Sequence, residues 1–114
     1  MQLLSVKISD VKRFWTYAQA SDTRSYHGTP CIEWTGGKNE KGYGQFGTGS
    51  KAAGNYKNWR VHRWAYLVFV GDIPETLQYE HLCENEACVN VWEHCELVTN
   101  QENDFRKWYR LGRR

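Results

Sequence analysis

The alternation of apolar and polar positions predicts two helices with short strands between them. Apolar residues at helical spacing follow a Ser-Asp cap and predict a helix over residues 10–20. The apolar and aromatic run over residues 61–70, which Gly71 and Pro74 close, predicts a second helix. Residues 31–34 alternate like a short strand that ends at a pair of glycines. The chain therefore mixes helix and strand.

The remaining segments predict further short strands and two more helices. Residues 42–47 form a second strand, in which glycines let the backbone bulge or approach closely, and residues 21–30 form a polar loop. Residues 78–90 predict two short strands joined by a tight loop, and a short helix follows over residues 91–96. A capping box at Thr99 predicts the start of a last helix.

Length and composition fit one small α+β domain over residues 1–114. A chain of 114 residues leaves no room for a second core, and its 40% hydrophobic and 25% charged residues are typical of a globular protein. No apolar run approaches the roughly 20 residues of a membrane helix, and the first ten residues lack the pattern of a signal peptide. We therefore expect a cytoplasmic protein without membrane contact, whose four cysteines bind metal rather than forming disulfides.

Charge is segregated along the chain. Residues 1–70 carry a balance of +6, residues 71–103 carry eight acids and no Lys or Arg, and residues 104–114 carry a balance of +4. Basic flanks suit the phosphates of a nucleic acid, and the acidic stretch between them could hold a divalent cation against a phosphate. The alternative is an ordinary solvated acidic face.

The cysteines have the spacing of metal ligands. Cys83 and Cys88 enclose four residues, and two thiolates at this spacing on a hairpin can converge on one Zn²⁺. Cys31 and Cys95 are the remaining cysteines that could complete a tetrahedral site, and His62 is an alternative ligand. The competing interpretation is a set of buried free cysteines, which are common in protein cores.

A second cluster of chemically active residues is interleaved with the cysteines. It consists of Glu80, His81, Asn90 and His94. Because consecutive strand residues face opposite sides, one of Glu80 and His81 can ligate a metal while the other faces the substrate. An imidazole outside the metal shell can act as a general base near neutral pH.

The motifs, taken in their order, resemble those of the HNH endonucleases. The stretch YEHLCENEACVNVWEHCELVT over residues 79–99 resembles the signature of this family. Further motifs follow the order of its small phage-type members: CIEWTG at 31–36, GYGQF at 42–46, VHRWAY at 61–66, GDIP at 71–74 and QEN at 101–103. The resemblance covers roughly residues 10–106, which is most of the chain.

The resemblance implies a ββα-metal, or His-Me finger, core over about residues 78–99. Structural zinc stabilises this core, and an N-terminal helix and a basic C-terminal helix over about residues 100–114 flank it. By the same resemblance, the protein hydrolyses phosphodiester bonds of double-stranded DNA, by nicking or by double-strand cleavage. It would act as a monomer or weak homodimer, in the host cytoplasm if it is phage-encoded.

The resemblance also implies a role for each residue of the second cluster. His81 is the general base that activates water, and Asn90 steadies the loop and orients this base. Glu80 and His94 hold one catalytic cation, either Mg²⁺ or Mn²⁺, although a histidine ligand also admits Ni²⁺ or Zn²⁺. Glu80 stands where the family usually has Asp, and one extra residue and no proline separate Asn90 from His94.

Basic residues outside the signature predict the contacts with DNA. Arg63 could neutralise the charge that develops on the scissile phosphate, although a surface or capping arginine is the simpler interpretation. The predicted contacts are Lys38, Lys41, Arg60, Arg63, Arg106, Lys107 and Arg110. Two other functions stay open. They are a non-catalytic zinc-containing DNA-binding module and a disulfide-bonded interaction domain without a nucleic-acid role.

Overall fold

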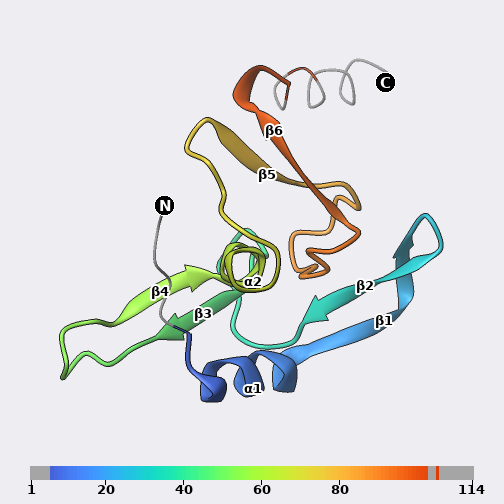
Figure 1. The fold of residues 1–114 in the computed structure, drawn as a ribbon. Helices are drawn as coiled ribbons and strands as arrows, with labels where there is room; N and C mark the ends of the chain where they lie inside the picture. Colours follow the sequence, from blue (N-terminus) through green and yellow to red (C-terminus); the bar gives the residue numbers. More distant parts are fainter. Residues whose placement is uncertain (1–5, 103–104, 106–114) are drawn as a thin grey trace.

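The first helix and its continuation into a strand form one edge of the molecule. A computed structural model describes residues 6–102 and residue 105, and in it α1 spans Ile8–Tyr17. The prediction of a helix over residues 10–20 is confirmed, but the helix ends earlier because Ala18 takes up an extended backbone. The chain then continues directly into β1, Ala18–Tyr26 (Figure 1).

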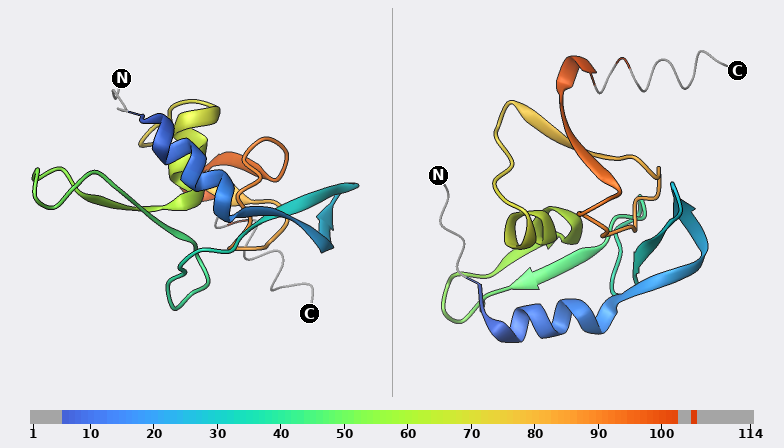
Figure 2. Two further views of the ribbon diagram at one scale, coloured as in Figure 1. Left: turned by 90° about the horizontal axis from the view of Figure 1, so that it is seen from below. Right: turned by 45° about the vertical axis from the view of Figure 1, so that its right-hand side comes forward.

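Three antiparallel hairpins surround the second helix in the described part of the chain. Figure 1 looks along α2, Val61–Phe69, which confirms the helix predicted over residues 61–70. The hairpins are β1 with β2 (Thr29–Trp34), β3 (Gln45–Thr48) with β4 (Lys57–Arg60), and β5 (Leu77–His81) with β6 (Cys95–Thr99). The β1–β2 and β3–β4 hairpins project in opposite directions (Figure 2).

Two strands lie where the sequence analysis predicted none. Residues 21–30, predicted as a loop, contribute to β1 and to the start of β2, and the two strands join through a turn in which His27 and Gly28 both have positive φ angles. Lys57–Arg60 form β4, which pairs residue by residue with β3. Both strands are polar and largely exposed, so their sequences lack the apolar alternation that identifies a strand.

The region around the signature also differs from its prediction. The second strand expected before residue 90 is reduced to a single bridge between Cys88 and Glu33, and residues 91–93 form a turn where a helix was expected. The partner of β5 is instead β6, which begins at Cys95. Helical backbone starts at Asn100, after Thr99 accepts a hydrogen bond from the Glu102 amide at 3.0 Å. The second strand and the short helix predicted within residues 78–96 are therefore absent, and the strand that pairs with β5 comes later in the chain.

Four aromatic side chains form the centre of the core. Phe14, Trp34, Phe46 and Trp64 come from α1, β2, β3 and α2, and the Phe46 and Trp64 ring centroids lie 4.5 Å apart. Gly44 lets β3 approach this cluster, because a Cβ there would lie 2.5 Å from atoms of Trp34 and Val61. The aromatic core thus ties α2 to the hairpins that carry the site. No helix in the described ranges is long and apolar enough to cross a membrane.

Candidate functional site

A buried cluster of three thiols and one imidazole joins three separate segments. Cys31 lies on β2, Cys83 and Cys88 lie in the loop after β5, and His94 immediately precedes β6. Their four ligand atoms all lie within 4.8 Å of one another. Cys31, Cys88 and His94 are almost completely buried, and Cys83 is partly exposed. The arrangement has the Cys₃His composition of a structural zinc site.

The distances within this cluster fit a tetrahedral metal ion. His94 Nδ1 lies 3.5 Å from Cys31 Sγ and 3.5 Å from Cys88 Sγ. With metal–sulfur and metal–nitrogen bonds of usual length, a tetrahedral zinc ion separates nitrogen from sulfur by about 3.6 Å. The residues present therefore match zinc in ligand type, number and spacing.

A chain of hydrogen bonds determines which ring nitrogen of His94 carries the proton and which keeps a lone pair for a metal ion. The Thr29 hydroxyl donates to the Tyr26 carbonyl at 2.8 Å, and Thr29 Oγ1 lies 2.7 Å from His94 Nε2. Since the hydroxyl proton is used on Tyr26, His94 Nε2–H is the donor to Thr29. Nδ1 therefore presents a lone pair to the three sulfurs, which is the tautomer that a metal ligand requires.

The thiols of the cluster shift one another's pKa values in opposite directions. A hydrogen bond from Cys88 lowers the pKa of Cys83 to about 5, against the effect of burial. The same interaction and burial raise the pKa of Cys88, and burial raises the pKa of Cys31. Cys83 is therefore the thiol of the cluster that loses its proton most readily, and the thiolate is the form that binds a metal ion.

Two predicted ligands, Cys95 and His94, have other surroundings than expected. The sequence assigned Cys95 to the zinc site and His94 to a catalytic cation beside Glu80. The structure instead places His94 among the thiols with both ring nitrogens engaged, while the Cys95 thiol donates to the Val91 carbonyl at 3.2 Å. The physical reason is that β6 begins at Cys95, so His94 belongs to the preceding turn and reaches the cluster from there. The alternative ligand His62 lies outside the cluster as well.

His81 is held by its backbone surroundings in one tautomer. Its Nε2 lies 3.2 Å from the carbonyl oxygen of Cys88, and because a carbonyl only accepts, Nε2 carries the proton. Nδ1 is then the atom with a free lone pair. Burial lowers the pKa of His81, which keeps the ring neutral at pH 7. A neutral, oriented imidazole that retains partial exposure has the properties of a general base.

Aromatic rings from three elements enclose His81. The ring centroid of His62 on α2 lies 4.7 Å from that of His81, Tyr79 lies at 5.0 Å and Tyr43 at 6.1 Å. His62 is only 5% exposed, and burial lowers its pKa to about 3. His62 Nδ1 is a buried atom without a hydrogen-bond partner among the described residues. The spacing of motifs along the chain contains no signal that His62 packs on His81.

Glu80 and Asn90, the two other residues of the predicted catalytic cluster, have separate surroundings. Glu80 is 6% exposed and alternates with His81 along β5, so its side chain lies on the opposite face, which it shares with its cross-strand partner Glu96. Asn90 donates to the Pro30 carbonyl at 3.2 Å and accepts from the Glu93 amide at 3.1 Å. These two bonds brace the turn that brings His94 to the thiols.

The predicted DNA contacts on described residues lie on the β3–β4 hairpin, the turn before it and α2. Lys38 and Lys41 are exposed before β3, and the Arg60 guanidinium lies 4.8 Å from the centre of the Tyr43 ring. Arg60 and Arg63 line a pocket of about 390 Å³. Arg106, Lys107 and Arg110 lie outside the described residues.

Comparison with known proteins places the site in a family context. Residues 60–105 match the HNH endonuclease family. The chain is 32% identical over 84 residues to "Uncharacterized gene 5.3 protein" of Enterobacteria phage T3, which covers 71% of this chain and 82% of that protein. It is 37% identical over 73 residues to "Protein 7.7" of Escherichia phage T7, which covers 64% of this chain and about half, 51%, of that protein. No solved structure matches the chain.

Proposed function

Because this chain belongs to the HNH endonuclease family, we propose that it is a metal-dependent endonuclease that hydrolyses phosphodiester bonds of double-stranded DNA. The observation that carries the proposal is the geometry of His81, whose Nε2–H is held by the Cys88 carbonyl while Nδ1 keeps its lone pair. In this reading β5, β6 and the helix that begins at Asn100 form the ββα-metal core.

His81 performs the proton transfer in this proposal. Its Nδ1 takes a proton from the water that attacks the phosphorus atom, and the ring becomes an imidazolium. The Cys88 carbonyl stabilises that cation through the existing hydrogen bond, since a charged donor strengthens it. The surrounding rings of His62, Tyr79 and Tyr43 restrict the orientation of the imidazole.

Glu80 is the residue that would hold the catalytic cation. Its carboxylate would supply the oxygen ligand that Mg²⁺ and Mn²⁺ prefer. A divalent cation bound there supplies Lewis-acid stabilisation of the charge on the leaving oxygen. His94 does not fit this role, because its two nitrogens face the thiols and Thr29.

The thiol–imidazole cluster supports the general base indirectly. Cys88 contributes its thiol to the cluster and its backbone carbonyl to His81, so one residue connects the two sites. Zinc in the cluster would fix the loop between β5 and β6, and with it the acceptor that orients His81. We therefore expect that removal of the structural metal also impairs catalysis by His81.

The test is a supercoiled-plasmid assay in Mg²⁺ or Mn²⁺ with wild-type protein, His81→Ala and the control His27→Asn. His27 lies exposed in the β1–β2 turn at positive φ, a backbone conformation that Asn tolerates. We expect metal-dependent conversion to open-circle or linear DNA, its loss by at least ~100-fold in His81→Ala, and wild-type rates in His27→Asn. Unchanged cleavage by His81→Ala would overturn the role of His81. Plasmid binding by wild-type protein without cleavage in either metal would favour the non-catalytic zinc-containing DNA-binding module instead.

A further inference from the structure

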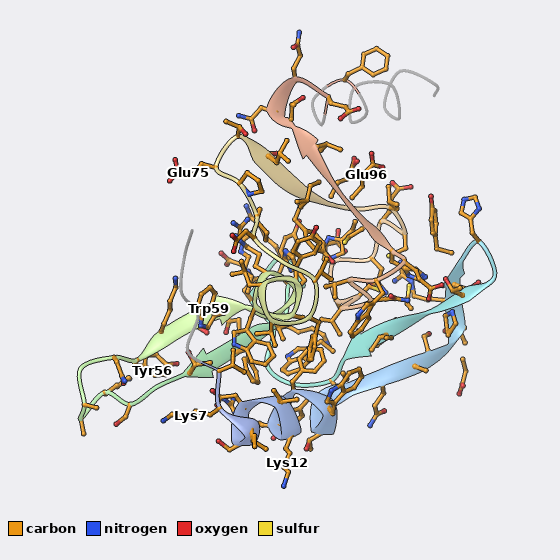
Figure 3. The ribbon with its side chains drawn as sticks, in the orientation of Figure 1. Lys7, Lys12, Tyr56, Trp59, Glu75 and Glu96 are labelled. Atoms are coloured by element: carbon orange, nitrogen blue, oxygen red, sulfur yellow. The ribbon has the colours of Figure 1, made fainter. Side chains whose placement is uncertain are left out.

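A basic pocket lies between β4 and the outer face of α2, beside the hairpin arm that Tyr56 and Trp59 mark in Figure 3. Its volume is about 390 Å³, within the range of sites that bind small molecules. The lining residues are Lys57, Asn58, Trp59, Arg60, Arg63, Leu67 and Ile73. All of them come from one strand, one helix and the segment that follows this helix.

The cations of this pocket are available to an anion. No carboxylate in the described part of the chain forms an ion pair with Lys57, Arg60 or Arg63. The sequence from residue 41 to residue 71 contains no Asp or Glu, so the surrounding surface does not neutralise them either. Two arginine forks and one ammonium group around a concave site match the charge and geometry of a phosphate group.

The other residues that line the pocket include apolar and aromatic side chains. Leu67 lies one helical turn after Arg63 on α2, and Ile73 follows the helix. The Trp59 ring is held in place by a hydrogen bond to Thr48 at 2.9 Å and by Lys57 Nζ at 3.8 Å from the ring centre. A phosphate group alone needs no apolar wall, whereas a nucleotide brings a planar, largely apolar base together with its phosphate.

One residue of the pocket is connected to the candidate general base through the ring of Tyr43. Arg60 contacts the ring of Tyr43 at 4.8 Å, and that ring lies 6.1 Å from the ring of His81. When a DNA strand lies with its scissile phosphate beside His81, a neighbouring nucleotide of that DNA strand is therefore within reach of the pocket.

We propose that the β4–α2 pocket binds one unstacked nucleotide of the DNA strand that is cleaved, next to the scissile phosphate. Lys57, Arg60 and Arg63 hold its phosphate, and its base lies against Leu67 and Ile73. The proposal rests on the nuclease function and adds a preference among its substrates, for DNA with an unpaired nucleotide near the cleavage position, such as a flap, gap or mismatch. A fully paired duplex pays the unstacking free energy before it can occupy the pocket.

The experiment measures binding without cleavage, so that it does not depend on catalysis. His81→Ala protein is titrated in Ca²⁺ against labelled oligonucleotides of one sequence that are fully paired, carry one unpaired nucleotide, or carry an unpaired abasic residue at that position. We expect the unpaired nucleotide to bind about 10-fold more tightly than the abasic residue, because roughly 60 Å² of apolar base surface leaves water in the pocket. Free deoxynucleoside monophosphate should compete only at far higher concentration, because it lacks the neighbouring phosphates.

Variants in the same His81→Ala background distinguish the role of the apolar residues of the pocket from the role of its cations. Leu67→Ala and Ile73→Ala should each reduce the preference for the base without weakening binding of the abasic duplex. Arg63→Ala should weaken the base-containing and abasic duplexes alike, because both present a phosphate to the pocket. Val70→Ala, an exposed change at the end of α2 outside the pocket, is the control. Equal binding of the base-containing and abasic duplexes, or equally tight competition by the free nucleotide, would overturn the proposal. If His81→Ala protein prefers the base-containing duplex but wild-type protein cleaves no plasmid, the pocket proposal stands and only the nuclease function is rejected.

Discussion

Replacing His94 with alanine tests which residues form the structural metal site. The substitution removes one of the four ligand atoms that lie within 4.8 Å of one another. Cys95→Ala is the matched control, because the adjacent thiol bonds to the Val91 carbonyl rather than to the cluster. The two variants distinguish the site seen in the structure from the four-cysteine site that the sequence suggested.

The expected magnitude follows from the free energy of a structural zinc site. Such sites bind zinc with about 10–16 kcal/mol at pH 7, so one ligand of four contributes roughly 2.5–4 kcal/mol. Loss of His94 should therefore weaken zinc binding by about 10²–10³-fold. If zinc saturates the wild-type protein, the lost linkage energy lowers Tm by about 10–15 °C for a chain of this length. Cys95→Ala should cost about 1 kcal/mol for its hydrogen bond and keep one zinc ion.

The assay combines metal analysis of the purified variants, competition with a chelating indicator, and thermal unfolding with and without chelator. Excess chelator should remove the part of the Tm difference that metal causes and leave only the part caused by the cavity at the fully buried His94. Wild-type zinc affinity in His94→Ala, or loss of zinc from Cys95→Ala, would refute the assignment. A wild-type protein that binds no zinc would refute the metal site as a whole.

Three further substitutions probe the surroundings of the site. Thr29→Val removes the acceptor of His94 Nε2–H and should weaken zinc binding about 10–100-fold without changing its stoichiometry; unchanged affinity in the indicator assay would contradict the proposed tautomer. Gly44→Ala places a Cβ 2.5 Å from atoms of Trp34 and Val61. It should lower the free energy of unfolding, measured in urea, by about 1–3 kcal/mol. A loss below about 0.5 kcal/mol would show that the core adjusts to the added methyl group. His62 has a pKa of about 3 in the fold, below its ordinary value of 6.5, so its contribution to stability is complete above pH 6.5 and is lost as the pH falls toward 3. His62→Leu should reduce the slope of unfolding free energy between pH 4.5 and 6.5 by up to about 1.4 kcal/mol per pH unit, and parallel profiles for the two proteins would reject the low pKa.

Local sequence determined the helices and the identity of the chemical groups. α1 and α2 have apolar residues at helical spacing, so their existence follows from residues close together in the chain. The Thr99 cap is likewise a local signal, and the Glu102 amide makes the expected bond to it. The sequence predicted one zinc site from all four cysteines, starting from the ligand spacing of Cys83 and Cys88, and three of the four lie in the cluster while Cys95 does not.

Only the tertiary structure decided how these groups are shared between sites. The sequence analysis assigned His94 to the catalytic cation, whereas its place among the thiols depends on contacts such as that with Thr29, which is 65 residues away and bonds to its second nitrogen. The packing of His62 on His81 and the union of β4 with α2 into a basic pocket also depend on contacts between distant segments. Residue spacing predicts which side chains share a face of one element, whereas the position of a turn relative to a strand end, here between His94 and Cys95, is set by the pairing of β6 with β5.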